Sequence, residues 1–280
     1  MTNYLIEETA DGSRTLYNSD FEEQYHSKAG AWQEAQIKYY DACRIEELAL
    51  NNTHIAIFEL GFGLGYNLIP FLNFFQNHPN KHIRYISCEF DTSLFSELYR
   101  LRHSLYPLEY VGFFEILLKE KVFDDEWLTI EIIEKDVRNA VLSLKTDSID
   151  AIYHDPFSPY KNTECWTKNL FDQYYRIMKN HAILSTYSMS TPVRSGIFQA
   201  GFFVYEGVGD QSKQSGTLAA KTATDLPKLD QKSTAKLHES PERIPFIDPD
   251  LNLDRMQIKS ERLIKKERGD YSDIIRKPLV

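Results

Sequence analysis

Residues 55–67 read IAIFELGFGLGYN, and this stretch decides the fold of the chain. The apolar run Ile55–Leu60 predicts a buried strand, and Tyr66–Phe75 predicts the helix that follows it. The turn between them carries three alternating glycines: Gly61, Gly63 and Gly65. Because this turn has few Cβ atoms, a ligand can lie against bare backbone beside the start of a helix. The stretch therefore predicts a cofactor site.

The spacing of the glycines distinguishes a dinucleotide site from sites for other cofactors. A dinucleotide site has the pattern G-x-G-x-x-G after a strand, but Tyr66 occupies the third glycine position here and the glycines run G-x-G-x-G. With Glu59 just ahead of them, the stretch resembles the first motif of the S-adenosylmethionine-dependent methyltransferases. A purely structural turn is the alternative for the glycines alone. The cofactor that the resemblance implies is S-adenosylmethionine, and we assign to its site Glu59, Gly61, Phe62, Gly63, Gly65 and Asn67.

Two further strands carry acidic residues to the same place. His82–Cys88 predicts a strand that ends on Glu89, whose carboxylate can accept hydrogen bonds from both ribose hydroxyls of an adenosine. A solvated strand end is the alternative for Glu89. Trp127–Ile133 predicts the next strand, and Asp136 follows it. We expect Asp136 either on the adenine side of the site or as the N-cap of a short helix.

A fourth strand, Ile149–Tyr153, completes an alternation of strands and helices, and Asp155 follows it. Such alternation predicts an α/β fold with a parallel, doubly wound sheet that binds ligands at the carboxyl ends of its strands. We therefore expect the class I, Rossmann-like methyltransferase fold. Three later strands would complete a mostly parallel, seven-stranded sheet: Ala182–Tyr187, Phe202–Tyr205 and Thr217–Lys221.

The other segments flank a methyltransferase core that we assign to residues 51–222. Residues 1–50 predict a hairpin and then, after a polar loop over residues 18–30, a helix from Ala31 to Leu50. Residues 102–126 are interpreted as an insertion that holds a helix, Tyr110–Lys119. Residues 223–280 form a C-terminal extension, and basic residues recur on its last helix: Arg255, Lys259, Arg262, Lys265, Lys266 and Arg268.

Composition limits the possible functions. The chain has 280 residues, with 32 basic and 41 acidic side chains, so its net charge of −9 argues against indiscriminate nucleic-acid binding but permits a local basic surface. Its 3 cysteines are far apart, which indicates neither disulfides nor a zinc site and fits a reducing compartment. No export signal or run of ~18 apolar residues is present, so we expect a cytoplasmic protein without a membrane contact. We predict no metal site.

Residues 155–166, DPFSPYKNTECW, carry a resemblance to a specific family. They resemble the D-G-F-A-P-x-K-N-P-x-x-W signature of the methyltransferase domain of MnmC, the bacterial enzyme that completes 5-methylaminomethyl-2-thiouridine at the tRNA wobble position. Residues 11–34, 193–202 and 244–249 resemble other stretches of that family, so the resemblance spans roughly residues 11–255. Pro156 replaces the usual glycine, and we expect a stand-alone form without the family's flavin-binding oxidoreductase domain.

The resemblance implies methylation of the aminomethyl group of 5-aminomethyl-(2-thio)uridine at the wobble position of tRNA. It also implies dependence on a separate enzyme that installs that group. Asp155 is our candidate for the catalytic carboxylate that holds the amine. We expect Lys161 and Arg194 to contact phosphates of the RNA, and Phe157, Tyr160 or Trp166 to stack on the base. A core position is the alternative for Trp166, which would begin the helix Trp166–Met178.

Other functions remain open at this point. A polyamine synthase shares the fold and also holds an amine with an aspartate near the fourth strand, but it transfers an aminopropyl group. A catalytically silent binding protein is a further alternative, against which the presence of Glu59, Glu89 and Asp155 argues. The basic C-terminal helix is either a tRNA contact or a solvated charged face. The chain lacks the G-x-S-x-G elbow of the Ser-His-Asp hydrolases and the G-x-x-x-x-G-K phosphate loop.

Overall fold

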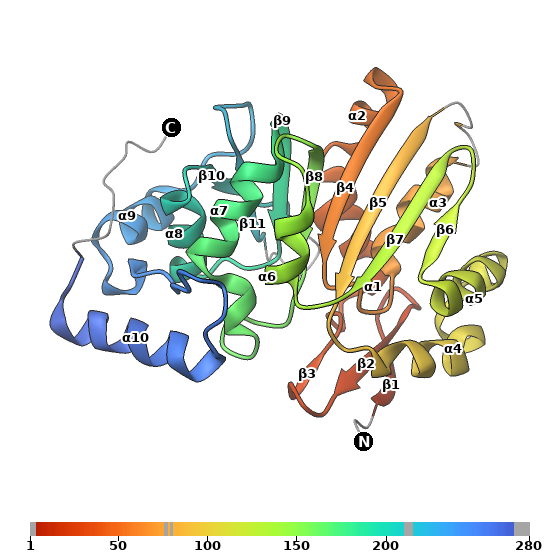
Figure 1. Cartoon of the computed structure of the whole chain (residues 1–280), viewed down its shortest axis with the longest axis horizontal. Coiled ribbons are helices and arrows are strands. Elements are labelled where there is room, and N and C mark those ends of the chain that lie inside the picture. Colours follow the sequence, from red (N-terminus) through yellow and green to blue (C-terminus); the bar gives the residue numbers. More distant parts are fainter. Residues whose placement is uncertain (1–3, 76–77, 79–80, 210–214, 272–280) are drawn as a thin grey trace.

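The computed structural model describes residues 4–75, 78, 81–209 and 215–271, and its centre is an eight-stranded sheet (Figure 1). The strands lie in the order β10-β11-β9-β8-β4-β5-β7-β6. Their bounds are β4 His54–Leu60, β5 His82–Glu89, β6 Val122–Asp124, β7 Leu128–Glu134, β8 Ile149–His154, β9 Met178–Thr186, β10 Phe203–Glu206 and β11 Thr217–Ala220.

The pairing confirms a mostly parallel sheet. Strands β7, β5, β4, β8 and β9 pair in parallel, while β11 is antiparallel to both β9 and β10. All seven predicted strands are present, but the sheet has an eighth, β6, which pairs antiparallel with β7 at the edge. Its three residues are too few to show a hydrophobic period, so the sequence did not reveal it.

Helices cover both faces of the sheet, because its central strands are apolar on both sides. Ile57 packs in one hydrophobic cluster with α2, α3, α4 and α5, whereas its neighbour Phe58 packs in the other with α6, α7 and α8. The bounds are α2 Ile45–Asn51, α3 Ile69–Phe75, α4 Ser93–Leu105, α5 Val111–Glu120, α6 Val137–Ala140, α7 Lys168–Ile177 and α8 Thr191–Gln199. The glycine turn leads through a 3-10 turn, Tyr66–Leu68, into α3, as the sequence predicts.

A small antiparallel sheet, formed by β1 Tyr4–Glu8, β2 Arg14–Asn18 and β3 Glu23–Gln24, confirms the predicted hairpin. Strand β3 lies where we expected only a loop. Figure 1 shows this sheet beyond the carboxyl ends of β4 and β5. The Tyr66 hydroxyl fastens it there by donating to the carbonyl of Arg14 at 2.8 Å. The sheet therefore stands over the place where ligands bind in such folds.

The expected continuous helix from Ala31 to Leu50 is broken. Helix α1, Ala31–Glu34, passes into a π-helical segment, Ala35–Asp41, and Arg44 then takes the left-handed conformation with φ 52° before α2 begins. The wider π turn carries two adjacent tyrosines, Tyr39 and Tyr40, that are both buried. The apolar period in the sequence did not distinguish this arrangement from a regular helix.

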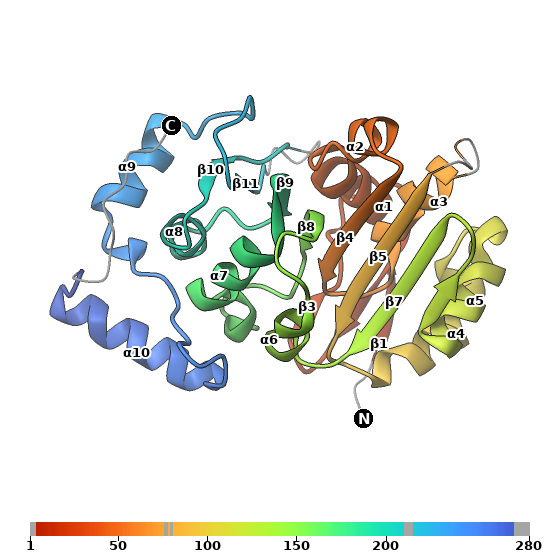
Figure 2. The same ribbon diagram turned by 45° about the horizontal axis from the view of Figure 1, so that its top comes forward.

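The C-terminal part adds α9 Gln231–Glu239 and α10 Arg255–Arg268, which Figure 2 shows beside α8 and α7. Helix α10 is basic, as predicted, but intramolecular carboxylates pair with several of its cations. Arg255 pairs with Glu164, and Arg262 and Lys266 both pair with Glu242. Residues 272–280 of the predicted extension lie outside the described residues. Among the helices described, none is long and apolar enough to cross a membrane.

Candidate active site

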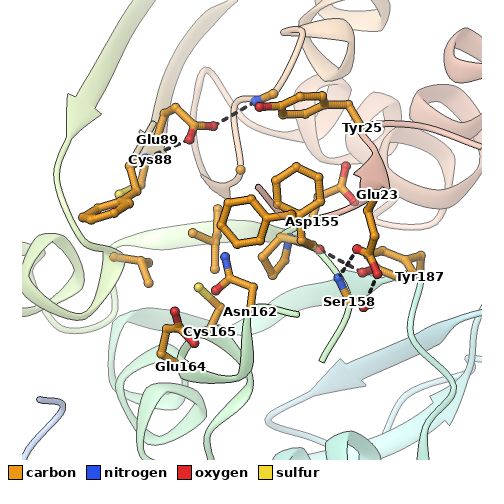
Figure 3. Close-up of a pocket in the computed structure, with 18 of the residues that line it drawn as sticks. Glu23, Tyr25, Cys88, Glu89, Asp155, Ser158, Asn162, Glu164, Cys165 and Tyr187 are labelled. Atoms are coloured by element: carbon orange, nitrogen blue, oxygen red, sulfur yellow. Dashed lines mark hydrogen bonds between the residues drawn. The ribbon is translucent and has the colours of Figure 1, made fainter. Parts of the chain in front are cut away.

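A pocket of about 520 Å³ opens at the carboxyl ends of β4, β5, β7 and β8 (Figure 3). The small N-terminal sheet contributes Glu23 and Tyr25 to its wall, and the loop after β8 contributes Ser158 and Asn162. The predicted convergence of strand ends is present, because Gly61, Glu89, Asp136 and Asp155 all line this pocket.

The glycine turn brings the backbone against the loop after β8. Gly61 has φ 92°, and a Cβ atom there would lie 2.5 Å from the carbonyl oxygen of Asp155. No other residue type fits this approach without moving the backbone. Gly63 lines the pocket, whereas Gly65 packs against Phe62 and Phe114 behind it. The turn thus joins the predicted cofactor loop directly to the candidate catalytic residue.

Besides Gly65, three of the assigned cofactor residues, Glu59, Phe62 and Asn67, lie behind the lining of the pocket. Phe62 is buried against Phe95, and Glu59 is completely buried. The Asn67 amide donates to Glu59 at 2.8 Å and to Asp155 Oδ2 at 3.4 Å. Burial raises the pKa of Glu59 to about 7, although hydrogen bonds from Ser87 and Asn67 oppose that rise. Glu59 therefore anchors the loop and reaches Asp155 through Asn67.

Glu89 occupies the tip of β5, and backbone amides hold both of its oxygens. Oε1 accepts from Phe90 and Asp91 at 2.9 Å each, and Oε2 accepts from Gly63 at 3.1 Å. Burial raises the pKa of Glu89 to about 7, and these backbone hydrogen bonds oppose that rise. A carboxylate offers about four acceptor positions, so one position remains for a ligand hydroxyl.

Phe90 is a pocket residue that we did not predict. Its side chain is 74 % exposed, yet it lines the pocket beside Glu89. An exposed aromatic ring next to a carboxylate is suited to stacking on a planar base. The sequence feature that could have predicted this role is the position of an aromatic residue directly after Glu89, at the end of the strand.

Asp136 fulfils the N-cap alternative and also lines the pocket. Its carboxylate accepts from the backbone of Arg138 at 2.9 Å and so caps α6. The Arg138 guanidinium pairs with Asp136 at 2.7 Å and with the fully buried Asp248 at 2.9 Å, and donates to the Leu253 carbonyl at 2.8 Å. Arg138 therefore ties the edge of the pocket to the segment that precedes α10.

Removal of the Arg138 guanidinium should destabilise the protein. In Arg138→Met, Asp248 keeps a buried charge without its partner, and we expect the free energy of unfolding to fall by about 3 kcal/mol in chemical denaturation. Arg100→Met is the matched control, because Arg100 forms an exposed pair with Glu97 on α4. Equal stability of the two variants would show that the Arg138 bridge contributes nothing.

Asp155 lies at the tip of β8 with its carboxylate at the pocket wall. The Tyr39 hydroxyl donates to Oδ1 at 2.5 Å, and Asn67 donates to Oδ2. Burial raises the pKa of Asp155 well above its usual value, and the nearby Glu34 and Glu59 carboxylates add to that rise, while the hydrogen bonds from Tyr39 and Asn67 lower it. Asp155 is therefore a carboxyl group prepared both to accept a hydrogen bond and to exchange a proton.

The loop after β8 is held by the small sheet. Both oxygens of Glu23 accept from Ser158, the backbone amide at 2.8 Å and the hydroxyl in a second bond. The Phe157 ring stacks on Phe21 with ring centroids 4.4 Å apart, and the Tyr187 hydroxyl donates to the Pro156 carbonyl at 2.8 Å. The N-terminal segment thus fixes the loop that carries Asp155 and closes one side of the pocket.

A buried charged pair forms another wall of the pocket. Lys38 Nζ lies 2.9 Å from Glu34 Oε1, and His26 lies beside them with its pKa lowered by burial. Sequence reasoning missed these residues. The sequence feature that could have predicted the pair is the spacing of Glu34 and Lys38, which lie four residues apart among apolar residues.

The structure corrects two of the expected substrate contacts, Trp166 and Arg194. Trp166 is completely buried and donates to the Phe157 carbonyl at 2.8 Å, so the core alternative holds. Arg194 is buried, pairs with Glu206 and donates to the Gly216 carbonyl. Lys161 lies at the surface, where it pairs with Glu22, and its contact with an RNA phosphate stays a prediction. Of the expected contacts, Phe157 lines the pocket, and Tyr160 is exposed beside it in sequence.

Comparison with known proteins identifies the family. Residues 103–222 match the family model of an S-adenosyl-L-methionine-dependent methyltransferase. A crystal structure of MnmC2 from Aquifex aeolicus aligns with a TM-score of 0.84 and 30 % identity, covering 96 % of this chain and 86 % of that one. These matches confirm the expected family, the class I fold and S-adenosylmethionine as its cofactor.

Two curated relatives extend the comparison. An uncharacterized protein of Methanocaldococcus jannaschii is 26 % identical over 95 % of this chain and 73 % of its own length. The tRNA 5-methylaminomethyl-2-thiouridine biosynthesis bifunctional protein MnmC of Campylobacter fetus is 28 % identical over 76 % of this chain, which spans only 35 % of that protein. The chain therefore belongs to the MnmC-like family of S-adenosylmethionine-dependent methyltransferases.

Proposed function

We propose that this protein transfers a methyl group from S-adenosylmethionine to the aminomethyl group of a uridine at the wobble position of tRNA. The observation that carries the proposal is the partly buried Asp155 carboxylate, which lines the same pocket as Gly61 and Glu89. The similarity to MnmC2 and to bifunctional MnmC supports the choice of substrate. The uridine must already bear its aminomethyl group, so a separate activity must supply that group.

The residues present fit S-adenosylmethionine. Glu89 retains an acceptor position for a ribose hydroxyl, Phe90 offers a ring for the adenine, and the glycine turn lines the pocket at Gly61 and Gly63, where the amino-acid portion can lie. The buried side-chain oxygen of Asn162, a pocket residue, has no hydrogen-bond partner among the described residues, and a bound ligand would complete its bonding. When bound, the cofactor supplies an electrophilic methyl group on a sulfonium.

The acceptor amine must be neutral for its lone pair to react. If its pKa is near the ~10.4 of a lysine, removal of the proton at neutral pH costs about 5 kcal/mol. Orientation of the reactants can contribute about 7–11 kcal/mol and so offset that cost. We assign the orienting role to Asp155, which accepts a hydrogen bond from the amine N–H. Its raised pKa also favours uptake of the proton that the ammonium form must lose.

The proposed step balances without a further reactant. The amine lone pair forms the new C–N bond, the S–C bond breaks, and its electron pair stays on sulfur as a neutral thioether. The product leaves as a secondary ammonium. Aromatic side chains at the pocket mouth, Phe21 and Phe157, provide ring surface near which the base can lie. The Arg255 guanidinium lies 5.2 Å from the centroid of the Phe21 ring and would have to exchange its pair with Glu164 for an RNA phosphate.

The proposal is tested with tRNA from cells that lack the gene for this protein. The purified protein is incubated with that tRNA and labelled S-adenosylmethionine, and the nucleosides are analysed by mass spectrometry. We expect conversion of 5-aminomethyl-(2-thio)uridine into its methylaminomethyl form. Parallel reactions contain decarboxylated S-adenosylmethionine and a free polyamine. Turnover only in those reactions would contradict the proposal and identify an aminopropyltransferase, and turnover in neither would indicate a binding protein.

A further inference from the structure

The contact between Tyr39 and Asp155 joins residues 116 positions apart and has no counterpart among the family residues we expected. We propose that Tyr39 is a positioning residue for methyl transfer: its hydroxyl holds Asp155 Oδ1 and leaves Oδ2 to receive the amine. This inference deepens the proposed function and rests on it for the identity of the amine.

Tyr39 is itself rigidly placed. Its side chain is completely buried, and its ring packs against Tyr153 with ring centroids 5.3 Å apart. The Ser185 hydroxyl of β9 donates to the carbonyl of Lys38, the preceding residue, and so ties the π-helical segment to the sheet. A hydroxyl carried by such a fixed ring can hold a carboxylate in one orientation.

The two oxygens of Asp155 are not equivalent. Oδ1 receives the hydrogen bond of 2.5 Å from Tyr39, while Oδ2 receives only the long contact of 3.4 Å from Asn67. The Asn67 amide makes its shorter bond, 2.8 Å, to Glu59. Oδ2 therefore keeps most of its acceptor capacity, and since Asp155 lines the pocket, we assign Oδ2 as the oxygen that receives the amine.

The charges around Asp155 explain why a donor is needed. Glu34 and Lys38 face it from the N-terminal helices, Glu59 from β4, and Tyr187 from the segment after β9. The two glutamates and burial favour the protonated carboxyl group. The Tyr39 hydrogen bond favours the carboxylate, so it preserves the form that accepts a hydrogen bond from the amine.

Tyr39→Phe and Tyr40→Phe form a matched pair of variants. Both keep the ring, and Tyr40 belongs to the same segment but packs on Phe71 with ring centroids 5.3 Å apart. We expect Tyr39→Phe to lower kcat about 10- to 100-fold, the effect of losing a hydrogen bond to a charged group, with KM for tRNA within about twofold. Tyr40→Phe should retain both constants. In the Asp155→Asn background, Tyr39→Phe should cause no further loss.

A second measurement does not depend on RNA. Infrared difference spectra of the protein at varied pH report the ionisation of Asp155, and Asp155→Asn identifies its carboxyl band. Tyr39→Phe should move that titration to higher pH, and Tyr40→Phe should not. An unchanged titration or an unchanged kcat in Tyr39→Phe overturns the inference. If the wild-type protein does not methylate the tRNA but the titration shifts, the proposed function fails and the hold of Tyr39 on Asp155 stands.

Discussion

Asp155→Asn should lower kcat at least about 1,000-fold and leave the affinity for S-adenosylmethionine within about threefold, because the loss is confined to one oriented charge at the pocket wall. Asparagine keeps the shape of the side chain, and its carbonyl oxygen can still accept from Tyr39. It cannot bear the negative charge that attracts and orients the amine. Single-turnover methylation and calorimetric cofactor binding measure the two effects separately.

The asparagine variant is a better probe than alanine. Alanine would leave the Tyr39 hydroxyl and the Asn67 amide facing a cavity, and buried donors without partners are costly. Asp150→Asn provides the control on the same strand, since Asp150 is buried among Lys179 and His181 and does not line the pocket. We expect that control to lose stability but to keep its kcat. If Asp155→Asn kept the kcat of the wild-type protein, Asp155 would have no role in methyl transfer.

Gly61→Ala should abolish cofactor binding and destabilise the fold. The new Cβ atom would stand 2.5 Å from the carbonyl oxygen of Asp155, and φ at this position is 92°. The backbone must therefore move, and we expect the free energy of unfolding to fall by about 2–4 kcal/mol and the affinity for S-adenosylmethionine to fall at least about 100-fold. Thermal unfolding and calorimetry measure these changes.

Gly112→Ala is the control for that substitution. Gly112 lies on α5, and a Cβ atom there would meet nothing within 4 Å. Because alanine favours the helix, the control should gain about 0.5–1 kcal/mol and keep its cofactor affinity. If Gly61→Ala had the same stability and cofactor affinity as Gly112→Ala, the glycine turn and the loop after β8 would not be in close contact.

The sequence predicted the parts of the site that depend on strand order. Gly61, Glu89, Asp136 and Asp155 each follow a buried apolar run, and parallel pairing brings such positions to one edge of the sheet. The apolar run before each residue was sufficient to predict its place, because each of these residues is positioned by its own strand.

The rest of the site depends on contacts that no local pattern contains. Tyr39 reaches Asp155 only because a π-helical segment interrupts the regular helical period. Arg194 looked like an RNA contact by residue type, but Glu206 and the Gly216 carbonyl surround it in the interior. Trp166 likewise fills the core beside His154. Burial of a charged or aromatic side chain is a property of the assembled fold, so residue type alone misassigned both.

The small sheet and Tyr39 have a practical consequence, since both come from the first fifty residues while the glycine turn and Glu89 come later. Asn51 and Asn52 form an exposed joint between these portions. A gene divided at that joint would encode two polypeptides. The larger would contain the glycine turn and Glu89, and the smaller would contain Tyr39. Methylation would then report their reassembly, which makes this enzyme a natural starting point for a split reporter of protein association.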